Sequence, residues 1–316
     1  MAGPLERILT ALGMPTLVDA LTERIGGADL TSLLLEVMRR RAARIDPPDL
    51  LQRYASDRFV GLPLASFAAL RRVEDALIAA CSGSFDVVAL APLVPLGTHS
   101  AIATVDQNKV VSTTRLNEVA ADPTNALALE AATRRRAALR DDPKSAALVR
   151  LAATQRVVRA QQMSGPRNFA HFQLFGFVSA GRDTGGRTFE ANAAAEHLVL
   201  HAGAVAALGA DSIKVSLTSF SGGDAAAIKA AARAALEPFA IVECVDDDAR
   251  ASGRGYYQSF CFKVHARFGD DTFETSDGGI VDWTQRLVGS AKERCFISGI
   301  GIDRLALVRA DPPGSP

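Results

Sequence analysis

Two glycines and an arginine near the end of the chain form the pattern with the clearest chemical content. Gly299 and Gly301 follow an apolar stretch, and Arg304 comes three residues later, where a second apolar segment begins. Glycines let a backbone approach a flat ligand closely, and an arginine at the start of the next helix can reach a phosphate oxygen. A dinucleotide fingerprint would carry a third glycine where Arg304 stands. Alone, the pattern fits an ordinary strand, turn and helix equally well.

A second cluster of arginines and phenylalanines lies upstream, in two apolar stretches that flank a loop. The first stretch ends at Arg159 and Gln161, the loop carries Arg167, and the returning stretch offers Phe169 and Phe172. An arginine on a phosphate, with an aromatic ring against a purine, is a common way to hold ATP. On its own, this hairpin is explained better by core phenylalanines and a surface arginine.

Composition bounds the class of protein. The 316 residues are 48% hydrophobic and carry 35 basic and 35 acidic side chains, so there is no general electrostatic case for nucleic-acid binding. The four cysteines are scattered without a C-x-x-C pair, which indicates free thiols in a reducing compartment rather than disulfides or a zinc site. The sequence shows no signal-peptide layout and no apolar run of membrane-spanning length. We therefore expect a cytoplasmic protein with no membrane partner.

The elements that position these residues follow from hydrophobic periodicity. Residues 1–69 are predicted to form a helical region in which Asp29 caps one helix and Pro47 and Pro48 stop it. Residues 70–310 alternate strands and helices and include a hairpin that turns at 269–271, and residues 311–316 form a tail. Hairpins surrounded by helices favour an α+β fold with a mostly antiparallel sheet.

The order of these patterns resembles the catalytic domain of class II aminoacyl-tRNA synthetases. Arg159-Ala160-Gln161 looks like the family's motif 2, Arg-x-Glu, and the Gly299 to Arg304 pattern looks like its motif 3. The segment from about Leu70 to Pro95 is a looser match to motif 1, the usual dimer element. The resemblance implies a class II synthetase-like antiparallel sheet flanked by helices, a homodimer, and ATP with Mg²⁺ as ligands.

Within that class, the chain resembles histidyl-tRNA synthetase and its relative, the regulatory subunit of ATP phosphoribosyltransferase. Arg254-Gly255-Tyr256-Tyr257 is similar to the family's Arg-Gly-Leu-Asp-Tyr-Tyr, shortened by two residues. The run that begins Gly278-Gly279 resembles Gly-Gly-Arg-Tyr-Asp-Gly-Leu, and Asp122-Pro123-Thr124 resembles Glu-Gly-Thr.

The resemblance implies a role for each matched residue. Arg159 would hold the α-phosphate and the substrate carboxylate, Arg254 would stabilise the transition state, and Arg304 would hold the γ-phosphate. Asp122 and Thr124 would bind an ammonium group. The remaining expected contacts are Gln161, Arg167, Phe169, Phe172, Gly299 and Gly301 with ATP, and Tyr256, Tyr257, Gly278 and Gly279 with the substrate.

Departures from the family pattern bear on function. Gln161 replaces the motif 2 glutamate, Ile280 and Val281 replace the family's Arg-Tyr, and Val178 stands near its imidazole-reading glutamate. A pocket without those polar groups should not select histidine, because the imidazole nitrogens need hydrogen-bond partners in the pocket. Because the sequence ends soon after motif 3, we expect no anticodon-binding domain of the family's kind.

The expected function is ATP-dependent activation of an amino acid or related carboxylate for transfer to an acceptor other than a conventional tRNA. The acceptor could be a protein, a carrier or a small molecule, and no specific tRNA is expected. The alternative is a non-catalytic regulatory subunit that binds a small ligand and a partner enzyme. A third possibility, a tRNA-binding accessory protein, rests on the arginine clusters at 39–41 and 134–136.

Other polar clusters are assigned to structure. His197 and His201 stand four residues apart on a predicted helix, but the sequence offers no evident third ligand, so we expect surface histidines and no metal. The acidic run Asp246 to Asp248 is expected to be a solvated turn.

Overall fold

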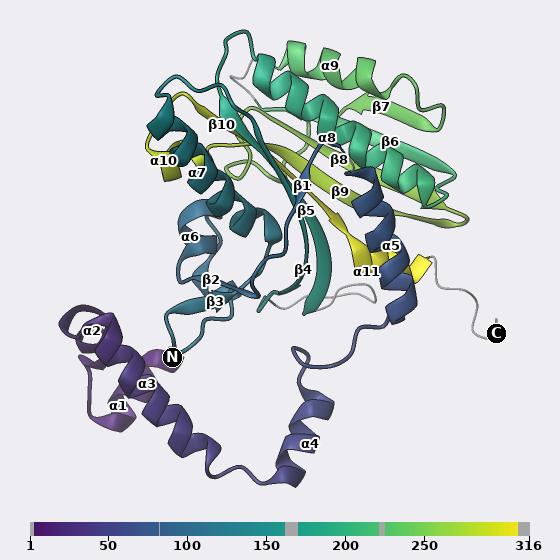
Figure 1. Cartoon of the computed structure of the whole chain (residues 1–316). Helices are drawn as coiled ribbons and strands as arrows, with labels where there is room; N and C mark the ends of the chain where they lie inside the picture. Colours follow the sequence, from purple (N-terminus) through teal and green to yellow (C-terminus); the bar gives the residue numbers. More distant parts are fainter. Residues whose placement is uncertain (1–2, 82, 162–169, 221–224, 309–316) are drawn as a thin grey trace.

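A computed structural model describes residues 3–81, 83–161, 170–220 and 225–308 of the chain (Figure 1). Its centre is an eight-stranded sheet in the order β1-β4-β5-β10-β9-β8-β6-β7. The five central pairings are antiparallel, whereas β1 with β4 and β6 with β7 are parallel. The expected α+β fold is confirmed, and the sheet is mixed because one parallel pair joins at each edge. The strands are β1 (Asp86–Val87), β4 (Val149–Val158), β5 (His171–Arg182), β6 (Ser212–Ser219), β7 (Val242–Asp246), β8 (Phe260–Phe268), β9 (Asp271–Val281) and β10 (Glu293–Gly301).

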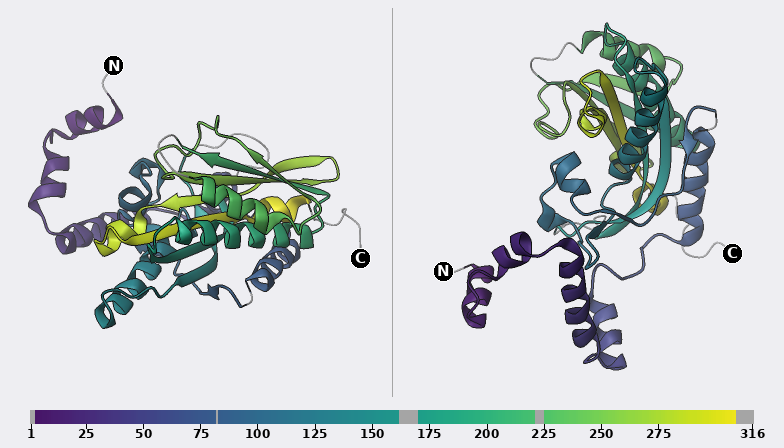
Figure 2. Two further views of the ribbon diagram at one scale, coloured as in Figure 1. Left: turned by 90° about the horizontal axis from the view of Figure 1, so that it is seen from above. Right: turned by 60° about the vertical axis from the view of Figure 1, so that its left-hand side comes forward.

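Helices cover both faces of the sheet (Figures 1 and 2). One face packs into an apolar cluster with α5 (Phe67–Ala80), α8 (Thr188–Ala207), α9 (Ala226–Leu236) and α11 (Ile302–Val308). The opposite face packs into a second cluster with α6 (Thr98–Ala103), α7 (Pro123–Asp141) and α10 (Trp283–Val288). Alternation along β10 shows why: Phe296 and Ile300 belong to the first cluster, and Cys295 and Ile297 to the second.

A small second sheet and a turn lie near α6. The second sheet pairs β2 (Leu93–Pro95) with β3 (Asn117–Val119), and a short 3₁₀ helix, η2, spans Gln107–Lys109. The predicted β8–β9 hairpin is confirmed, and Gly269 adopts the positive φ of 59° that its tight turn requires. Within the described residues, no helix is long and apolar enough to cross a membrane.

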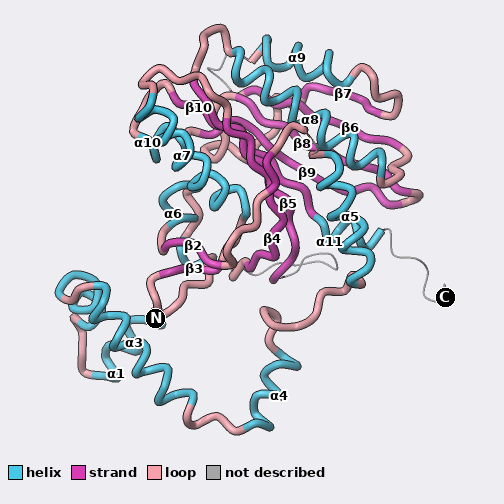
Figure 3. The backbone as a smooth tube through the Cα atoms, viewed as in Figure 1, coloured by secondary structure: helices cyan, strands magenta, loops and turns pink. Residues whose placement is uncertain are grey.

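The N-terminal helices form an arm that stands away from the sheet (Figures 2 and 3). The arm contains α1 (Pro4–Leu12), α2 (Leu17–Asp19), the π-helix η1 (Ala20–Arg24), α3 (Gly27–Ala42) and α4 (Pro47–Ser56), and no residue of these helices is buried. The predicted helical region is present, but two details differ. Gly26 rather than Asp29 precedes α3, and Pro47 begins α4 instead of stopping α3, because a proline fits the first turn of a helix.

The two histidines of α8 correct another expectation. His197 and His201 are 1% and 0% exposed, not surface residues. Both bond to the Ser298 hydroxyl of β10, at 2.7 Å from His197 Nδ1 and 2.8 Å from His201 Nε2. Burial lowers the pKa of His201 to about 3 and that of His197 well below its ordinary value. They are neutral core residues, and the described residues hold no cluster of three or more metal-binding side chains.

Candidate functional site

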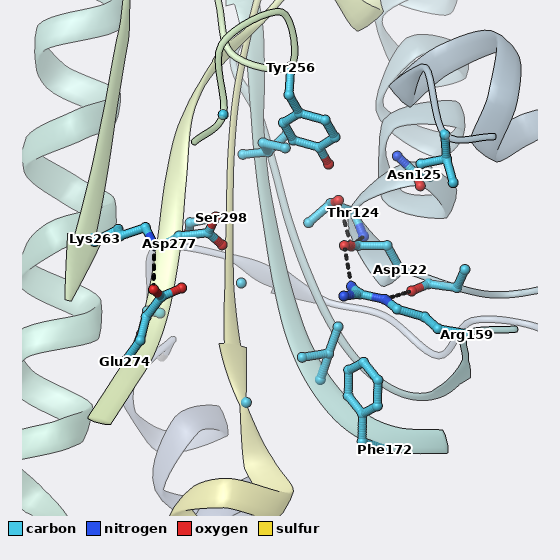
Figure 4. Close-up of a pocket in the computed structure, with 18 of the residues that line it drawn as sticks. Asp122, Thr124, Asn125, Arg159, Phe172, Tyr256, Lys263, Glu274, Asp277 and Ser298 are labelled. Atoms are coloured by element: carbon cyan, nitrogen blue, oxygen red, sulfur yellow. Dashed lines mark hydrogen bonds and ion pairs between the residues drawn. The ribbon is translucent and has the colours of Figure 1, made fainter. Parts of the chain in front are cut away.

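A cavity of about 570 Å³ opens on the sheet face that carries α6 and α7 (Figure 4). Its floor is formed by β5, β8, β9 and β10, and one wall by the start of α7. Most of the residues that the sequence singled out line it together, although they come from segments far apart in the chain. They are Asp122, Thr124, Arg159, Gln161, Phe172, Tyr256, Tyr257, Gly299, Gly301 and Arg304.

Arg159 lies at one end of the cavity, directly after β4. Its Nε donates to the Ala121 carbonyl at 3.1 Å, and its Nη2 lies 3.3 Å from Asp122 Oδ2. The guanidinium carbon also lies 5.0 Å from the centre of the Phe172 ring on β5 (Figure 4). Arg159 is thus held in place while its side chain stays one-third exposed and available to an anion.

The two glycines of β10 leave the sheet floor flat. A Cβ added at Gly299 would meet nothing nearer than the Phe175 carbonyl at 3.8 Å, and one at Gly301 nothing nearer than the Thr275 carbonyl at 4.0 Å. Both residues line the cavity, so the missing side chains leave space for a ligand rather than for a packing neighbour.

Arg304 follows these glycines on the first turn of α11. Its Nη1 donates to the Glu274 carbonyl of β9 at 3.4 Å. The preceding residue, Asp303, is 3% exposed and accepts the Gln173 amide at 2.6 Å. This bond ties the start of α11 to β5 and therefore fixes where the Arg304 side chain begins.

The wall at the start of α7, next to Arg159, carries a carboxylate and a hydroxyl. Asp122 precedes α7, and its Oδ1 accepts both the Thr124 amide at 2.9 Å and the Thr124 hydroxyl at 2.7 Å. Tyr256 is hydrogen-bonded to Thr124 and closes the same side of the cavity. Its pKa is raised well above the ordinary value, mainly by burial and secondly by the nearby carboxylates Asp122 and Asp277. The phenol is therefore a neutral hydrogen-bonding group at physiological pH.

Two further charged residues line the cavity without a sequence pattern that marks them, a carboxylate on the floor and an arginine beside it. Asp277 of β9 pairs in register with Gly299, and its Oδ2 accepts the Tyr257 hydroxyl at 3.1 Å. Burial and the neighbouring Glu274 raise the pKa of Asp277. Arg250 Nη2 lies 4.0 Å from Asp277 Oδ2, and its Nε donates to the Ser252 carbonyl at 2.9 Å. No sequence signal marked Asp277, because only the strand register brings it opposite Gly299.

Three expected site residues lie elsewhere. The Arg254 guanidinium lies over the Phe220 ring, 5.0 Å from its centre, and Arg250 rather than Arg254 lines the cavity. Gly278 and Gly279 do not line it either, because they pack against neighbouring strands: an added Cβ would come within 2.5 Å of Ser298 Cβ and 2.6 Å of the Phe260 carbonyl, respectively. Arg167 and Phe169 lie outside the described residues.

The three apolar residues that were expected to shape the substrate pocket are core residues. Val178, Ile280 and Val281 are 0%, 5% and 2% exposed, and none of them lines the cavity. Val178 and Val281 pack into the apolar cluster beneath α7 and α10, and Ile280 packs into the cluster on the other face. Their apolar character therefore belongs to the interior and not to the cavity wall.

Comparisons with known proteins agree on the fold. No protein-family model matches the sequence, and no curated protein matches it significantly. Among solved structures, an ATP phosphoribosyltransferase regulatory subunit/histidyl-tRNA synthetase from Bacillus halodurans is 16% identical with a TM-score of 0.59, over 78% of this chain and 80% of that one. A histidine–tRNA ligase subunit from Alicyclobacillus acidocaldarius is 15% identical with a TM-score of 0.56, over 78% and 94%.

A third structure, the histidyl-tRNA synthetase of S. aureus, is 15% identical with a TM-score of 0.56. The match covers 75% of this chain but spans only 64% of that protein's length. These likenesses support a class II synthetase-like fold, as the sequence motifs predicted. At such identities they carry the fold alone.

Proposed function

We propose that this chain uses ATP to activate an amino acid or a related carboxylate by adenylation, for transfer to an acceptor other than a conventional tRNA. One observation carries the proposal: a single cavity is lined by Asp122 and Thr124 at one wall, by Arg159 and Phe172 at one end, and by the open β10 floor with Arg304 beyond it. A cation for a phosphate, a carboxylate for an ammonium and a flat floor for a base are what the reaction needs side by side.

The nucleotide half of the proposal places ATP between two arginines. The adenine ring would lie against Phe172 and over the floor at Gly299, with its amino group reaching Gln161. Arg159 would contact the α-phosphate, and Arg304 the γ-phosphate. Arg58, which follows α4 at the base of the N-terminal arm, supports this end, because its Nη1 and Nη2 donate to the Gln161 and Ala160 carbonyls at 3.1 and 2.6 Å.

The amino-acid half uses the wall at the start of α7, beside Arg159. Asp122 and Thr124 would take the ammonium group, and Arg159 would hold the carboxylate close to the α-phosphorus. A carboxylate oxygen then forms the new bond to that phosphorus, and the bond to the pyrophosphate leaving group breaks. Arg159 would neutralise charge that builds up on the α-phosphoryl oxygens. The 3.3 Å contact between Arg159 and Asp122 would be exchanged for contacts with the two ligands.

The cavity contains a carboxylate, Glu274, that fits a phosphate-bound Mg²⁺. Such an ion needs only one or two protein carboxylates, since phosphate oxygens and water supply the other ligands. Glu274 lines the cavity, its backbone carbonyl contacts Arg304, and its carboxylate pairs with Lys263 at 2.5 Å. Glu274 would hold the ion after releasing Lys263, and the bound ion would supply further neutralisation of the phosphates.

The arginine clusters give little support to tight tRNA binding. Arg135 is fully buried against Glu293, and Arg134 pairs with Asp86 and Glu130. In the arm, Glu36 accepts ion pairs from Arg39 and Arg40. Because phosphate contacts need clustered, available cations, we expect weak, salt-sensitive binding that does not distinguish between tRNA species. Filter binding at physiological salt, with the Arg39–Arg41 triple alanine variant for comparison, measures this.

The alternative is a non-catalytic subunit that binds a small ligand and regulates a partner enzyme. It is favoured by the position of Arg254, since the arginine expected to stabilise the transition state stacks on Phe220 outside the cavity. Arg250 offers a replacement, because it is 8% exposed and lines the cavity beside Asp277. The adenylation proposal therefore makes Arg250 the residue whose loss should abolish turnover. A homodimer remains a prediction that light scattering would check.

The test is an ATP–pyrophosphate exchange screen over all standard amino acids. Adenylation requires exchange with at least one amino acid, abolished in Arg159→Ala and Arg250→Ala but retained in Arg254→Ala. Histidine is included in the screen, because the three apolar residues on which its exclusion rested do not line the cavity. If ATP and an amino acid both bind but no exchange occurs, the regulatory alternative replaces the proposal.

A further inference from the structure

Asn125 is a cavity residue whose side-chain hydrogen-bond donor is unpaired among the described residues. It follows Thr124 on the first turn of α7, is 1% exposed and lines the cavity. Its Oδ1 lies 2.6 Å from His99 Nδ1, whereas its Nδ2 has no hydrogen-bond partner among the described residues. Buried amide nitrogens normally have a hydrogen-bond partner, so an unpaired one in a cavity wall indicates that a ligand accepts the bond.

The orientation of the amide is set by His99. The backbone N–H of Ala121 donates to His99 Nε2 at 3.0 Å, so Nε2 carries no proton and the proton of the neutral ring lies on Nδ1. Nδ1–H must therefore face an acceptor, which is the oxygen of Asn125. Flipping the amide would set two donors against each other. The Nδ2 group is consequently directed away from His99.

His99 is itself held firmly. It is 0% exposed, and its backbone N–H donates to Glu118 Oε1 at 2.9 Å. The other oxygen of Glu118 accepts the Gly97 amide at 3.0 Å and the Gln107 side chain at 2.7 Å. The backbone of α6 and the polar groups around Glu118 thus fix the ring, and through it the amide of Asn125.

The neighbouring polar groups leave the donor for a ligand. Figure 4 shows the Asn125 amide directed toward Tyr256, at the end of the cavity away from Phe172. Tyr256 is hydrogen-bonded to Thr124, and the Tyr257 hydroxyl donates to Asp277. If ATP occupies the Phe172 end and the ammonium lies at Asp122, the substrate side chain extends to the Asn125 end.

We propose that Asn125 Nδ2 donates to a carbonyl oxygen in the side chain of the amino-acid substrate, which therefore carries a neutral amide or urea group. The inference rests on the proposed function, because it assumes that an amino acid enters with its ammonium at Asp122. An anionic side chain would approach the carboxylates of Asp122 and Asp277, and the cations beside these two groups, Arg159 and Arg250, already pair with them. Hydrocarbon and ammonium side chains offer no acceptor and would leave the donor unpaired.

The experiment compares amino acids of similar size with wild type and an isosteric variant. The probes are L-glutamine, L-asparagine and L-citrulline against L-glutamate, L-methionine and L-lysine, each in pyrophosphate exchange and in calorimetric titration without ATP. Asn125→Asp keeps an acceptor for His99 and replaces the donor by a second oxygen; it also adds a negative charge, which suits the first turn of a helix and which the uncharged variant Asn125→Leu avoids. Asn192→Asp on the exposed side of α8 makes the same chemical change away from the cavity.

At least one of L-glutamine, L-asparagine and L-citrulline is expected to bind wild type at least tenfold more tightly than L-glutamate, L-methionine and L-lysine do. Asn125→Asp should remove that preference, and Asn192→Asp should keep it. Asn125→Leu, of similar volume, should give the same loss. Calorimetric preference without exchange would defeat adenylation but support the side-chain assignment. Equal weakening of all six probes, a wild-type preference for lysine or methionine, or no binding of any probe would overturn it.

Discussion

Replacing Gly299 by alanine separates a ligand-binding role from a structural one. The added Cβ would lie 3.8 Å from its nearest neighbour, an ordinary contact, and Gly299 does not adopt a positive φ. Alanine in a strand is about 0.5–1 kcal/mol more favourable than glycine, so folding should be unchanged or slightly improved. The methyl group would instead fill the cavity floor where the nucleotide base is proposed to lie.

The expected loss of ATP affinity follows from the cost of overpacking. Forcing an extra methyl group into a close contact costs about 1–3 kcal/mol, which corresponds to roughly 5- to 150-fold in the dissociation constant. Gly278→Ala is the contrasting variant: its Cβ would lie 2.6 Å from the Ile297 carbonyl, a backbone atom that cannot move aside cheaply. That change should destabilise the protein by about 1–3 kcal/mol.

Urea unfolding and calorimetric titration with Mg·ATP measure the two quantities on the same samples. We expect a stable Gly299→Ala protein with weakened nucleotide binding and a destabilised Gly278→Ala protein. A stable Gly299→Ala variant that binds ATP as tightly as wild type would refute the assignment of the β10 floor.

Three further predictions concern the ion pair, the buried histidines and the arm. Arg135→Met should destabilise the fold by about 3–5 kcal/mol, because it leaves the buried carboxylate of Glu293 unpaired; adding Glu293→Leu should restore most of this in denaturant unfolding, and an unchanged single variant would contradict the argument. The buried neutral His201 binds protons only when unfolded, so stability should be flat above its unfolded pKa near 6.5 and fall as pH drops toward its folded pKa of about 3. This histidine alone should account for about 2 kcal/mol between pH 7 and pH 5, a loss that His201→Gln must reduce in urea unfolding at the two pH values. Arg58→Ala should weaken ATP binding several-fold without a change in unfolding, whereas Arg53→Ala on α4 should not; equal titrations for the two variants would exclude a role for the arm in the nucleotide site.

Local patterns were sufficient to predict the fold class and the chemistry-bearing ends of strands. Strand periodicity and a Gly-Asp-Asp turn located β8 and β9, and the Gly299–Arg304 spacing located a strand that enters a helix. These features depend on residues close together in the sequence. Pro47 shows how far such local patterns can be trusted. It was predicted to end the preceding helix, but it begins α4, because a proline marks a helix boundary without indicating on which side the helix lies.

Features that depend on strand register or burial could not be predicted in the same way. Asp277 of β9 enters the site only because it is the register partner of Gly299 on the adjacent strand β10. Val178 and Ile280 alternate into the interior, which a single sequence cannot distinguish from a pocket wall. Arg250 lines the cavity and Arg254 does not, and the spacing of the motif alone could not distinguish the two positions.

A crystal structure with a non-hydrolysable ATP analogue and Mg²⁺ tests the central claim most directly. We expect the adenine ring against Phe172 and over Gly299, the α-phosphate at Arg159 and the terminal phosphate at Arg304. A nucleotide bound at any other surface, with this cavity empty at saturating analogue, would contradict it.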